Sequence, residues 1–227
     1  MSRTLQLTEQ LISLPSVTPE DAGCLELLAD ALLPMGFACE RIDSGPDSFR
    51  VRNLWARRSG AGTDRPVLVF AGHTDVVPVD GQQWSTNPFA LTEKGGRLYG
   101  RGSCDMKGFI AASLALVPEF LATQRARPVH LAFSYDEEIG CAGAPVMINQ
   151  LKAEGARFDG CVVGEPTSMQ VVVAHKGINL YRCRVHGKAA HSSLTPRGCN
   201  AIEYAARLIC RIRDIADHYR ANGPYDE

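Results

Sequence analysis

The hydrophobic residues of this chain follow two patterns: helical spacing, and short uninterrupted runs. The predicted helices are the segments with helical spacing: 1–14, 19–35, a segment starting near 107, 143–153 and 200–217. The predicted buried strands are the continuous apolar runs: 66–73, 128–138 and 158–166. Two shorter extended segments, near 37–43 and 51–57, precede them. Strands that alternate with helices predict an α/β fold with a mostly parallel sheet flanked by helices.

Turn and capping residues predict where some of these helices begin and end. Thr18 is expected to cap the second helix, with Pro19 in its first turn and Asp21 as the acid of a capping box. Gly36 is expected to end that helix. Pro118 should kink or split the helix that starts near residue 107, because proline lacks the N–H that an α-helix needs.

The pattern changes after Val171. Residues 171–187 predict one or two solvent-facing strands, and the helix over 200–217 carries one apolar stripe. We therefore expect a domain boundary near residue 175, with one domain over 1–175 and the start of a smaller α+β domain over 176–227.

Composition and charge exclude several classes of protein. The chain of 227 residues is 45% apolar and 22% charged, with a net charge of −1, which gives no case for binding nucleic acid or an anionic membrane. No apolar run approaches the roughly 18–20 residues of a membrane helix. The first segment lacks the continuous apolar region of a signal peptide. Eight scattered cysteines without a C-x-x-C pair indicate reduced thiols, so we expect a cytoplasmic protein.

Acidic residues and one histidine collect at the ends of the predicted strands. They are His73 and Asp75 after the first strand, Asp136, Glu137 and Glu138 in the second, Glu165 in the third, and Asp105 in the glycine-rich loop before a helix. Ligands of open α/β sheets bind at the carboxyl ends of the strands, so these side chains are expected to converge.

Several carboxylates at one place need a counter-charge, and no matching cluster of lysine and arginine lies beside them. One histidine with several carboxylates suits zinc, and the number of ligands favours two ions. His73 would then bind metal while Asp75 orients its ring. Of Glu137 and Glu138, one would bind metal and the other would activate water; the residues alone leave open which does which.

Other polar residues in these segments have simpler interpretations. Cys104 could be a thiolate ligand, but a carboxylate-rich site favours the neighbouring Asp105. His175 and His186 are expected to be exposed or structural. The residue type leaves His191 open, either as part of a polar loop or as a functional group.

Six motifs together resemble the di-zinc aminoacylase and carboxypeptidase family: GHTDVVP, W…NPF, LYGRGSCDMKG, DEEIGCAGA, GEPT and GKAAHSSLTPRGCNAIEYAARLI. The resemblance covers essentially the whole chain in a consistent order. Within the family the motifs look most like those of acetylornithine deacetylases, with succinyl-diaminopimelate desuccinylases as close relatives.

The resemblance implies a role for each site residue. His73 and Glu165 would bind one zinc ion, Glu138 would bind a second, and Asp105 would bridge both; cobalt or manganese could occupy the same ligands. The resemblance also implies that Asp75 would orient the ring of the ligand His73 without binding metal itself. Glu137 would be the general base, and His191 would reach the active site of a partner subunit. Residues 1–175 would form the catalytic domain and 176–227 an incomplete lid and dimerisation domain of a homodimer.

The implied reaction is hydrolysis of the acetyl amide of N2-acetyl-L-ornithine to acetate and L-ornithine, a step of arginine biosynthesis. The alternatives are a desuccinylase or another aminoacylase that acts on a small acylated amino acid, and, from a different class, a non-catalytic metal-binding protein.

In the family a last histidine ligand follows the lid. No residue here matches it, and His218 lies on the predicted lid helix, so the chain is expected to be part of a longer protein.

Overall fold

The structure is a computed structural model that describes residues 2–46, 50–59, 67–122 and 128–223. The chain divides into two compact units, Met1–Val171 and Val172–Glu227. The helices of the first unit are α1 (Arg3–Ile12), α2 (Cys24–Leu32), the 3₁₀ turn η1 (Leu33–Met35), α3 (Lys107–Ala122) and α4 (Gly143–Ala153). Its strands are β1 (Ala38–Ser44), β2 (Val51–Arg58), β3 (Leu68–His73), β4 (Thr92–Lys94), β5 (Arg97–Tyr99), β6 (Val129–Ser134) and β7 (Gly160–Val163).

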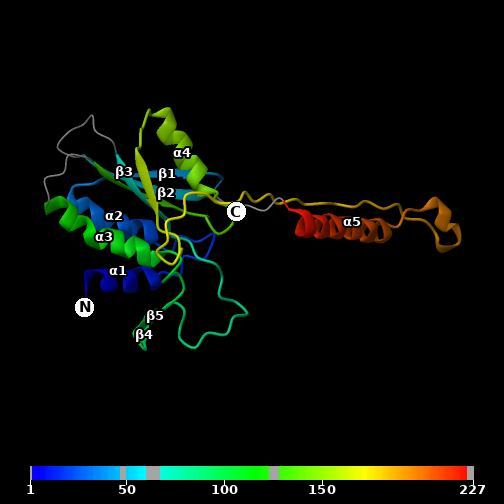
Figure 1. The fold of residues 1–227 in the computed structure, drawn as a ribbon, viewed down its shortest axis with the longest axis horizontal. Coiled ribbons are helices and arrows are strands. Elements are labelled where there is room, and N and C mark those ends of the chain that lie inside the picture. The colour runs from blue at the N-terminus through cyan, green and yellow to red at the C-terminus, as the bar shows by residue number, and fades with distance from the viewer. Residues whose placement is uncertain (1, 47–49, 60–66, 123–127, 224–227) are drawn as a thin grey trace. The chain divides into compact units, whose positions relative to one another are not determined.

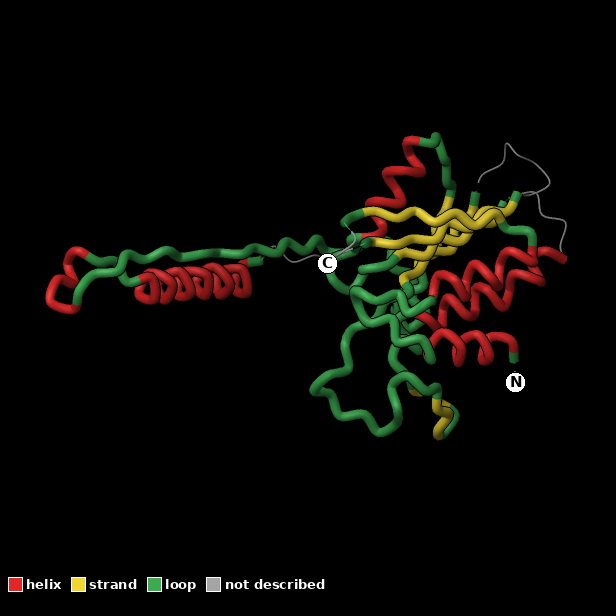
Figure 2. The backbone as a smooth tube through the Cα atoms, turned by 180° about the vertical axis from the view of Figure 1, so that it is seen from behind, coloured by secondary structure: helices red, strands yellow, loops and turns green. Residues whose placement is uncertain are grey.

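Five strands form the central sheet of the first unit, in the order β1-β2-β6-β3-β7. Figures 1 and 2 show this sheet together with its helices. The neighbours β6, β3 and β7 are parallel, whereas β1 and β2 run antiparallel to their neighbours. His73 pairs with Ser134 and Ala71 with Val163, so the three parallel strands end at one edge of the sheet. The predicted α/β class is confirmed.

Helices cover both faces of this sheet. The helices α2 and α3 pack on one face, with α1 against α3, and α4 packs on the other face (Figure 1). The first face buries a cluster that includes Leu28, Ile110 and Leu131, and the second buries Trp55 with Met147. Burying an apolar side chain of this size stabilises a fold by about 1.5–3 kcal/mol, so the two clusters hold the sheet rigid beneath the loops at its edge.

The start of α2 differs from the prediction. The helix begins at Cys24, after Gly23 in the left-handed conformation (φ 85°), and not at Pro19. The segment before the helix is extended, because Val17 forms a parallel β-bridge with Val76 and so cannot be part of a helix. Asp21 still serves the helix start: its carboxylate accepts a hydrogen bond from the N–H of Leu25 at 3.3 Å.

Other predicted elements also differ from the structure. The helix α3 is continuous through Pro118, so it is not split there. The strands β6 and β7 end at Ser134 and Val163, which leaves the acidic residues in the loops beyond them. The glycine-rich loop includes β5, paired with β4 in a short hairpin. Residue 66, the predicted first residue of β3, lies outside the described residues.

The second unit consists of an extended segment, the 3₁₀ segment η2 (Ser192–Arg197) and α5 (Ala201–Asn222). The predicted helix is confirmed; the Asn200 side chain caps it by accepting a hydrogen bond from the N–H of Ile202 at 3.0 Å. The strands predicted over 171–187 are wrong. A strand needs a neighbour for its N–H and C=O groups, and no described residue forms a ladder with this segment.

Among the described residues, no helix is both long enough and apolar enough to cross a membrane.

Candidate metal centre

His73, the last residue of β3, lies at the centre of an acidic cluster. Its Nδ1 atom lies 2.9 Å from the backbone oxygen of Asp75. A carbonyl oxygen only accepts hydrogen bonds, so Nδ1 must carry a proton and donate it. The other ring nitrogen, Nε2, faces three carboxylates, with Asp105 Oδ1 at 3.0 Å, Glu165 Oε1 at 3.7 Å and Glu137 Oε2 at 3.9 Å.

The topology explains why residues so distant in sequence meet here. Glu137 follows β6 and Glu165 follows β7, the two parallel strands on either side of β3. Asp105 comes from the loop that leads into α3. The carboxyl ends of parallel strands share one edge of a sheet, and that edge is where ligands bind in open α/β folds.

Asp75 lies behind the histidine and is fully buried. Its Oδ2 atom accepts hydrogen bonds from the backbone N–H of Glu138 at 3.1 Å and from the hydroxyl of Thr18 at 3.2 Å, and its Oδ1 atom lies 3.5 Å from His73 Nδ1. Burial alone would raise the pKa of Asp75, but the nearby ring of His73 and hydrogen bonds from backbone N–H groups outweigh it and lower that pKa. The buried side chain therefore remains a carboxylate.

The loop after β6 separates the two neighbouring glutamates. Asp136 has a left-handed backbone conformation (φ 60°), and the N–H groups of Gly140 and Cys141 both donate to the carbonyl of Glu137, at 2.9 and 2.8 Å. As a result, the Glu137 carboxylate faces His73, while Glu138 is held through its backbone. Burial, followed by the charge of Asp105, raises the pKa of Glu138.

The cluster holds more negative than positive charge. Burial of His73 alone would lower its pKa, but its hydrogen bond to Asp75 and the charges of Asp75, Glu165 and Glu137 raise that pKa to about 9. Burial raises the pKa of Glu165, and the charges of Asp105 and Glu137 add to this. Among the described side chains of the cluster, protonated His73 is the one positively charged group. The surrounding carboxylates therefore share a single positive charge unless a further cation binds.

A divalent metal ion fits this arrangement. One ligand atom each from His73, Asp105 and Glu165 lies within 4.8 Å of the other two. An imidazole nitrogen with carboxylate oxygens is a donor set that binds zinc and similar ions. The hydrogen bond from Nδ1 to the Asp75 carbonyl leaves the lone pair of Nε2 for the metal once its proton has left.

The raised pKa of His73 predicts how the stability of the metal-free protein depends on pH. The pKa of His73 rises from its ordinary value of 6.5 to about 9, so the stabilising charge is fully present below pH 6.5 and is lost as pH rises through about 9. We expect the free energy of unfolding to fall between pH 7 and pH 9.5, measured by urea denaturation in chelator. His73→Gln should flatten this fall, and an equally steep fall in that variant would contradict the assignment.

The structure also describes the surroundings of the other candidate residues. Cys104 is exposed and is not part of the compact ligand group, in line with the preference for Asp105. His191 lies in the second unit, at the N-cap of η2, where its Nδ1 accepts a hydrogen bond from the N–H of Ser193 at 3.3 Å. His175 and His186 are exposed, as is His218 on α5.

Sequence reasoning missed two residues that support the site. The hydroxyl of Thr18 contacts Asp75, although the sequence pattern predicted a helix cap. Lys107, two residues after Asp105, is completely buried, and its Nζ donates to the carbonyls of Leu11 at 2.8 Å and Leu14 at 2.7 Å. It ties the start of α3 to the end of α1. A lysine is rarely buried, so no sequence signal marked it.

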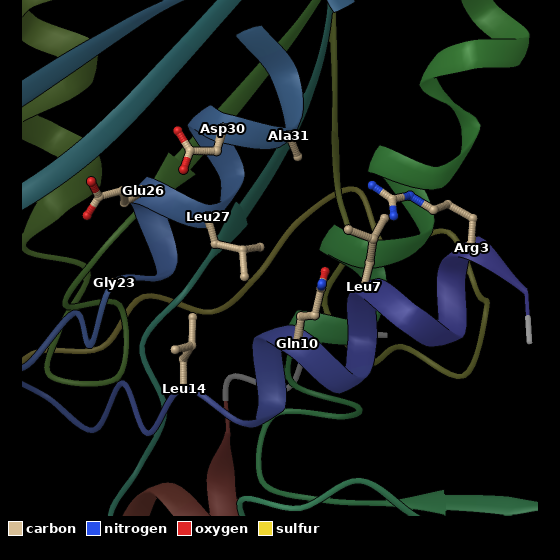
Figure 3. Close-up of a pocket in the computed structure, with 9 residues that line it drawn as sticks. All are labelled: Arg3, Leu7, Gln10, Leu14, Gly23, Glu26, Leu27, Asp30 and Ala31. Atoms are coloured by element: carbon tan, nitrogen blue, oxygen red, sulfur yellow. The ribbon is translucent and has the colours of Figure 1, made fainter. Parts of the chain in front are cut away.

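A hollow in the first unit lies away from these acids. It measures about 450 Å³ and opens between α1 and α2 (Figure 3). Leu7, Leu14 and Leu27 line it, with the charged residues Arg3 and Asp30 at its sides. None of the clustered acids lines this hollow, so the hollow is not part of the candidate metal centre.

Comparisons with known proteins assign the chain to a family. The model of a family described as "Peptidase family M20/M25/M40" matches residues 69–222. Succinyl-diaminopimelate desuccinylase of Delftia acidovorans (strain DSM 14801 / SPH-1) is 57% identical over 221 residues, which cover 93% of this chain and 57% of that protein. The protein of the same name from Paracidovorax citrulli (strain AAC00-1) is 59% identical over 176 residues, which cover 75% of this chain and 45% of that protein.

A solved structure agrees with these matches. Human carnosine dipeptidase 1 superimposes with a TM-score of 0.63 and 26% identity, over 70% of this chain and 38% of that one. This chain spans a little over half the length of the Delftia relative. The relatives carry the name that sequence analysis gave as an alternative, and not that of an acetylornithine deacetylase. On the family match and the shared fold, the chain belongs to peptidase family M20/M25/M40.

Proposed function

We propose that the protein takes part in the metal-dependent hydrolysis of succinyl-diaminopimelate, with release of succinate and diaminopimelate. The observation that supports the reaction class is the group of His73, Asp105 and Glu165, whose ligand atoms are close enough to hold a metal ion, with the Glu137 carboxylate beside it. The names of the relatives support the succinyl group over the acetyl group of the first expectation.

Each residue at the metal centre has a proposed role in binding the metal or in orienting a ligand. His73 and Glu165 would hold one zinc ion, Asp105 would be shared, and Glu138 would contribute to a second ion. Bound zinc lowers the pKa of water toward neutrality and polarises a carbonyl group. Asp75 keeps the ring of His73 in one tautomer, because its backbone carbonyl accepts the proton of Nδ1.

Glu137 is proposed as the general base. Its Oε2 atom lies at the edge of the cluster, 3.9 Å from His73 Nε2, and its backbone is fixed by the turn at Gly140. The carboxylate would take a proton from the attacking water and pass it to the leaving nitrogen of the amide. This role needs a carboxylate that stays free of the metal. Neither Glu137 nor Glu138 belongs to the compact ligand group, and the choice of Glu137 rests on its carboxylate facing His73 and on the family resemblance.

The second unit is proposed to serve as a lid and dimerisation domain of a cytoplasmic homodimer. Within it, His191 is exposed and would steady the developing oxyanion in the active site of a partner subunit. The family resemblance supports this role. Its Nδ1 atom accepts the hydrogen bond from the N–H of Ser193, which leaves the Nε2 N–H group to donate to an oxyanion.

A substrate comparison tests the proposed function. The zinc-loaded chain and the Delftia relative, as the positive control, are assayed on succinyl-diaminopimelate and on N-acetylornithine. We expect this chain to prefer the succinyl substrate, measured as kcat/KM from release of the free amine. Preference for N-acetylornithine would restore the first expectation. Hydrolysis by the relative with none by this chain would contradict an activity of this chain.

A further inference from the structure

The thiol of Cys141 lies against the proposed general base. Its Sγ atom lies 3.3 Å from Oε1 of Glu137, within hydrogen-bonding distance for sulfur, and the S–H group is the donor. The other oxygen of the same carboxylate, Oε2, faces His73 Nε2. The two oxygens of Glu137 therefore have different neighbours, one a thiol and the other the metal-binding group.

The backbone directs the thiol to this position. Cys141 has a left-handed conformation (φ 58°), which glycine adopts far more readily than a residue with a Cβ atom. Its N–H donates to the Glu137 carbonyl at 2.8 Å, so the turn brings the two side chains to the same side. The side chain is exposed, so packing in the core does not explain a cysteine in this conformation.

Although the side chain is largely exposed, partial burial of its sulfur, followed by its hydrogen bond to Glu137 and the charge of that carboxylate, raises the pKa of Cys141 to about 11. At neutral pH the thiol keeps its proton and remains a donor. A thiolate would instead repel the neighbouring carboxylate.

We propose that Cys141 is a positioning residue whose thiol holds Oε1 of Glu137 and so turns Oε2 toward the metal centre. The inference rests on the proposed role of Glu137 as general base. A carboxylate left to rotate would present its basic oxygen to the attacking water for a smaller fraction of the time, and catalysis depends on such alignment.

Infrared spectroscopy tests the contact without any substrate. The S–H stretching band of Cys141 is identified as the band that Cys141→Ser removes, and Cys104→Ser serves as a matched control for another exposed thiol. We expect the Cys141 band to lie at a hydrogen-bonded frequency and to move to that of a free thiol in Glu137→Ala. A band that Glu137→Ala leaves in place would overturn the inference, whatever the substrate proves to be.

Kinetics test the consequence of the contact. Cys141→Ala and Cys141→Gly remove the donor, and the glycine also relieves the left-handed backbone. We expect both to lower kcat by about 3- to 10-fold, with KM and metal content unchanged, because S–H is a weak donor. Cys141→Ser keeps a donor and should recover most of the loss.

The outcomes separate the inference from the proposed function. Wild-type kcat in both Cys141→Ala and Cys141→Gly would contradict a positioning role. So would a serine variant as slow as the alanine variant. If the unsubstituted protein hydrolyses neither substrate, the proposed function fails, and the infrared experiment still decides whether the thiol holds Glu137.

Discussion

Glu137→Gln is expected to lower kcat by about 10²- to 10⁴-fold while the metal content stays unchanged, since this is the usual contribution of a general base. Glutamine keeps the size and the hydrogen-bond acceptor of the side chain but cannot take a proton from water. The carboxylate faces the metal-binding group without belonging to it, so its loss should leave the ligands in place. The measurement is kcat at saturating substrate, together with metal content by elemental analysis.

A matched control removes a charge elsewhere on the same unit. Glu119 is exposed on α3, and Glu119→Gln should keep wild-type kcat and metal content. An undiminished rate in Glu137→Gln would show that another group accepts the proton. Loss of metal in that variant would instead indicate that Glu137 is a metal ligand, and Glu138 would then become the candidate for the general base.

Asp105→Asn is expected to weaken zinc binding by more than the roughly 10- to 100-fold that loss of an outer partner of a metal ligand costs. Asp105 Oδ1 is the carboxylate oxygen closest to His73 Nε2, at 3.0 Å, and it is the residue proposed to be shared by two ions. The amide has nearly the same shape but carries no charge, so the variant isolates the electrostatic contribution. The measurement is the zinc dissociation constant by competition with a chromophoric chelator.

Asp80→Asn provides the control for this substitution, because Asp80 is an exposed acid on a loop of the same unit. Its zinc affinity should equal that of the unsubstituted protein. Equal zinc affinity in Asp105→Asn and Asp80→Asn would mean that the ion binds elsewhere or that Asp105 is no ligand.

The sequence predicted the order of strands and helices because its apolar runs and periodic segments are long and distinct. The parallel strands β3, β6 and β7 follow from such runs, and the site follows from what comes after each of them. Details that depend on contacts between distant segments could not be predicted in this way. The start of α2 is one example, because the bridge from Val17 to Val76 draws the preceding residues away from a helix.

Side-chain partners within the site show the same limit. Alternation along a strand places His73 and Asp75 on one side, but it does not show that the backbone carbonyl of Asp75 accepts the hydrogen bond from Nδ1. Nor does it reveal the hydroxyl of Thr18 beside Asp75 or the thiol of Cys141 beside Glu137. The strands predicted after residue 171 failed for a related reason, since amino-acid preference cannot supply a pairing partner.

The most direct test of the metal centre is a calorimetric titration of zinc into the chelator-treated chain at pH 7.5, in two buffers with different enthalpies of ionisation. Zinc should bind with release of about one proton, because His73 Nε2 has to lose its proton to become a ligand. His73→Gln should abolish both the tight binding and the proton release. A folded, chelator-treated chain that takes up no zinc, or that binds it as tightly without His73, would contradict a metal centre at the end of β3.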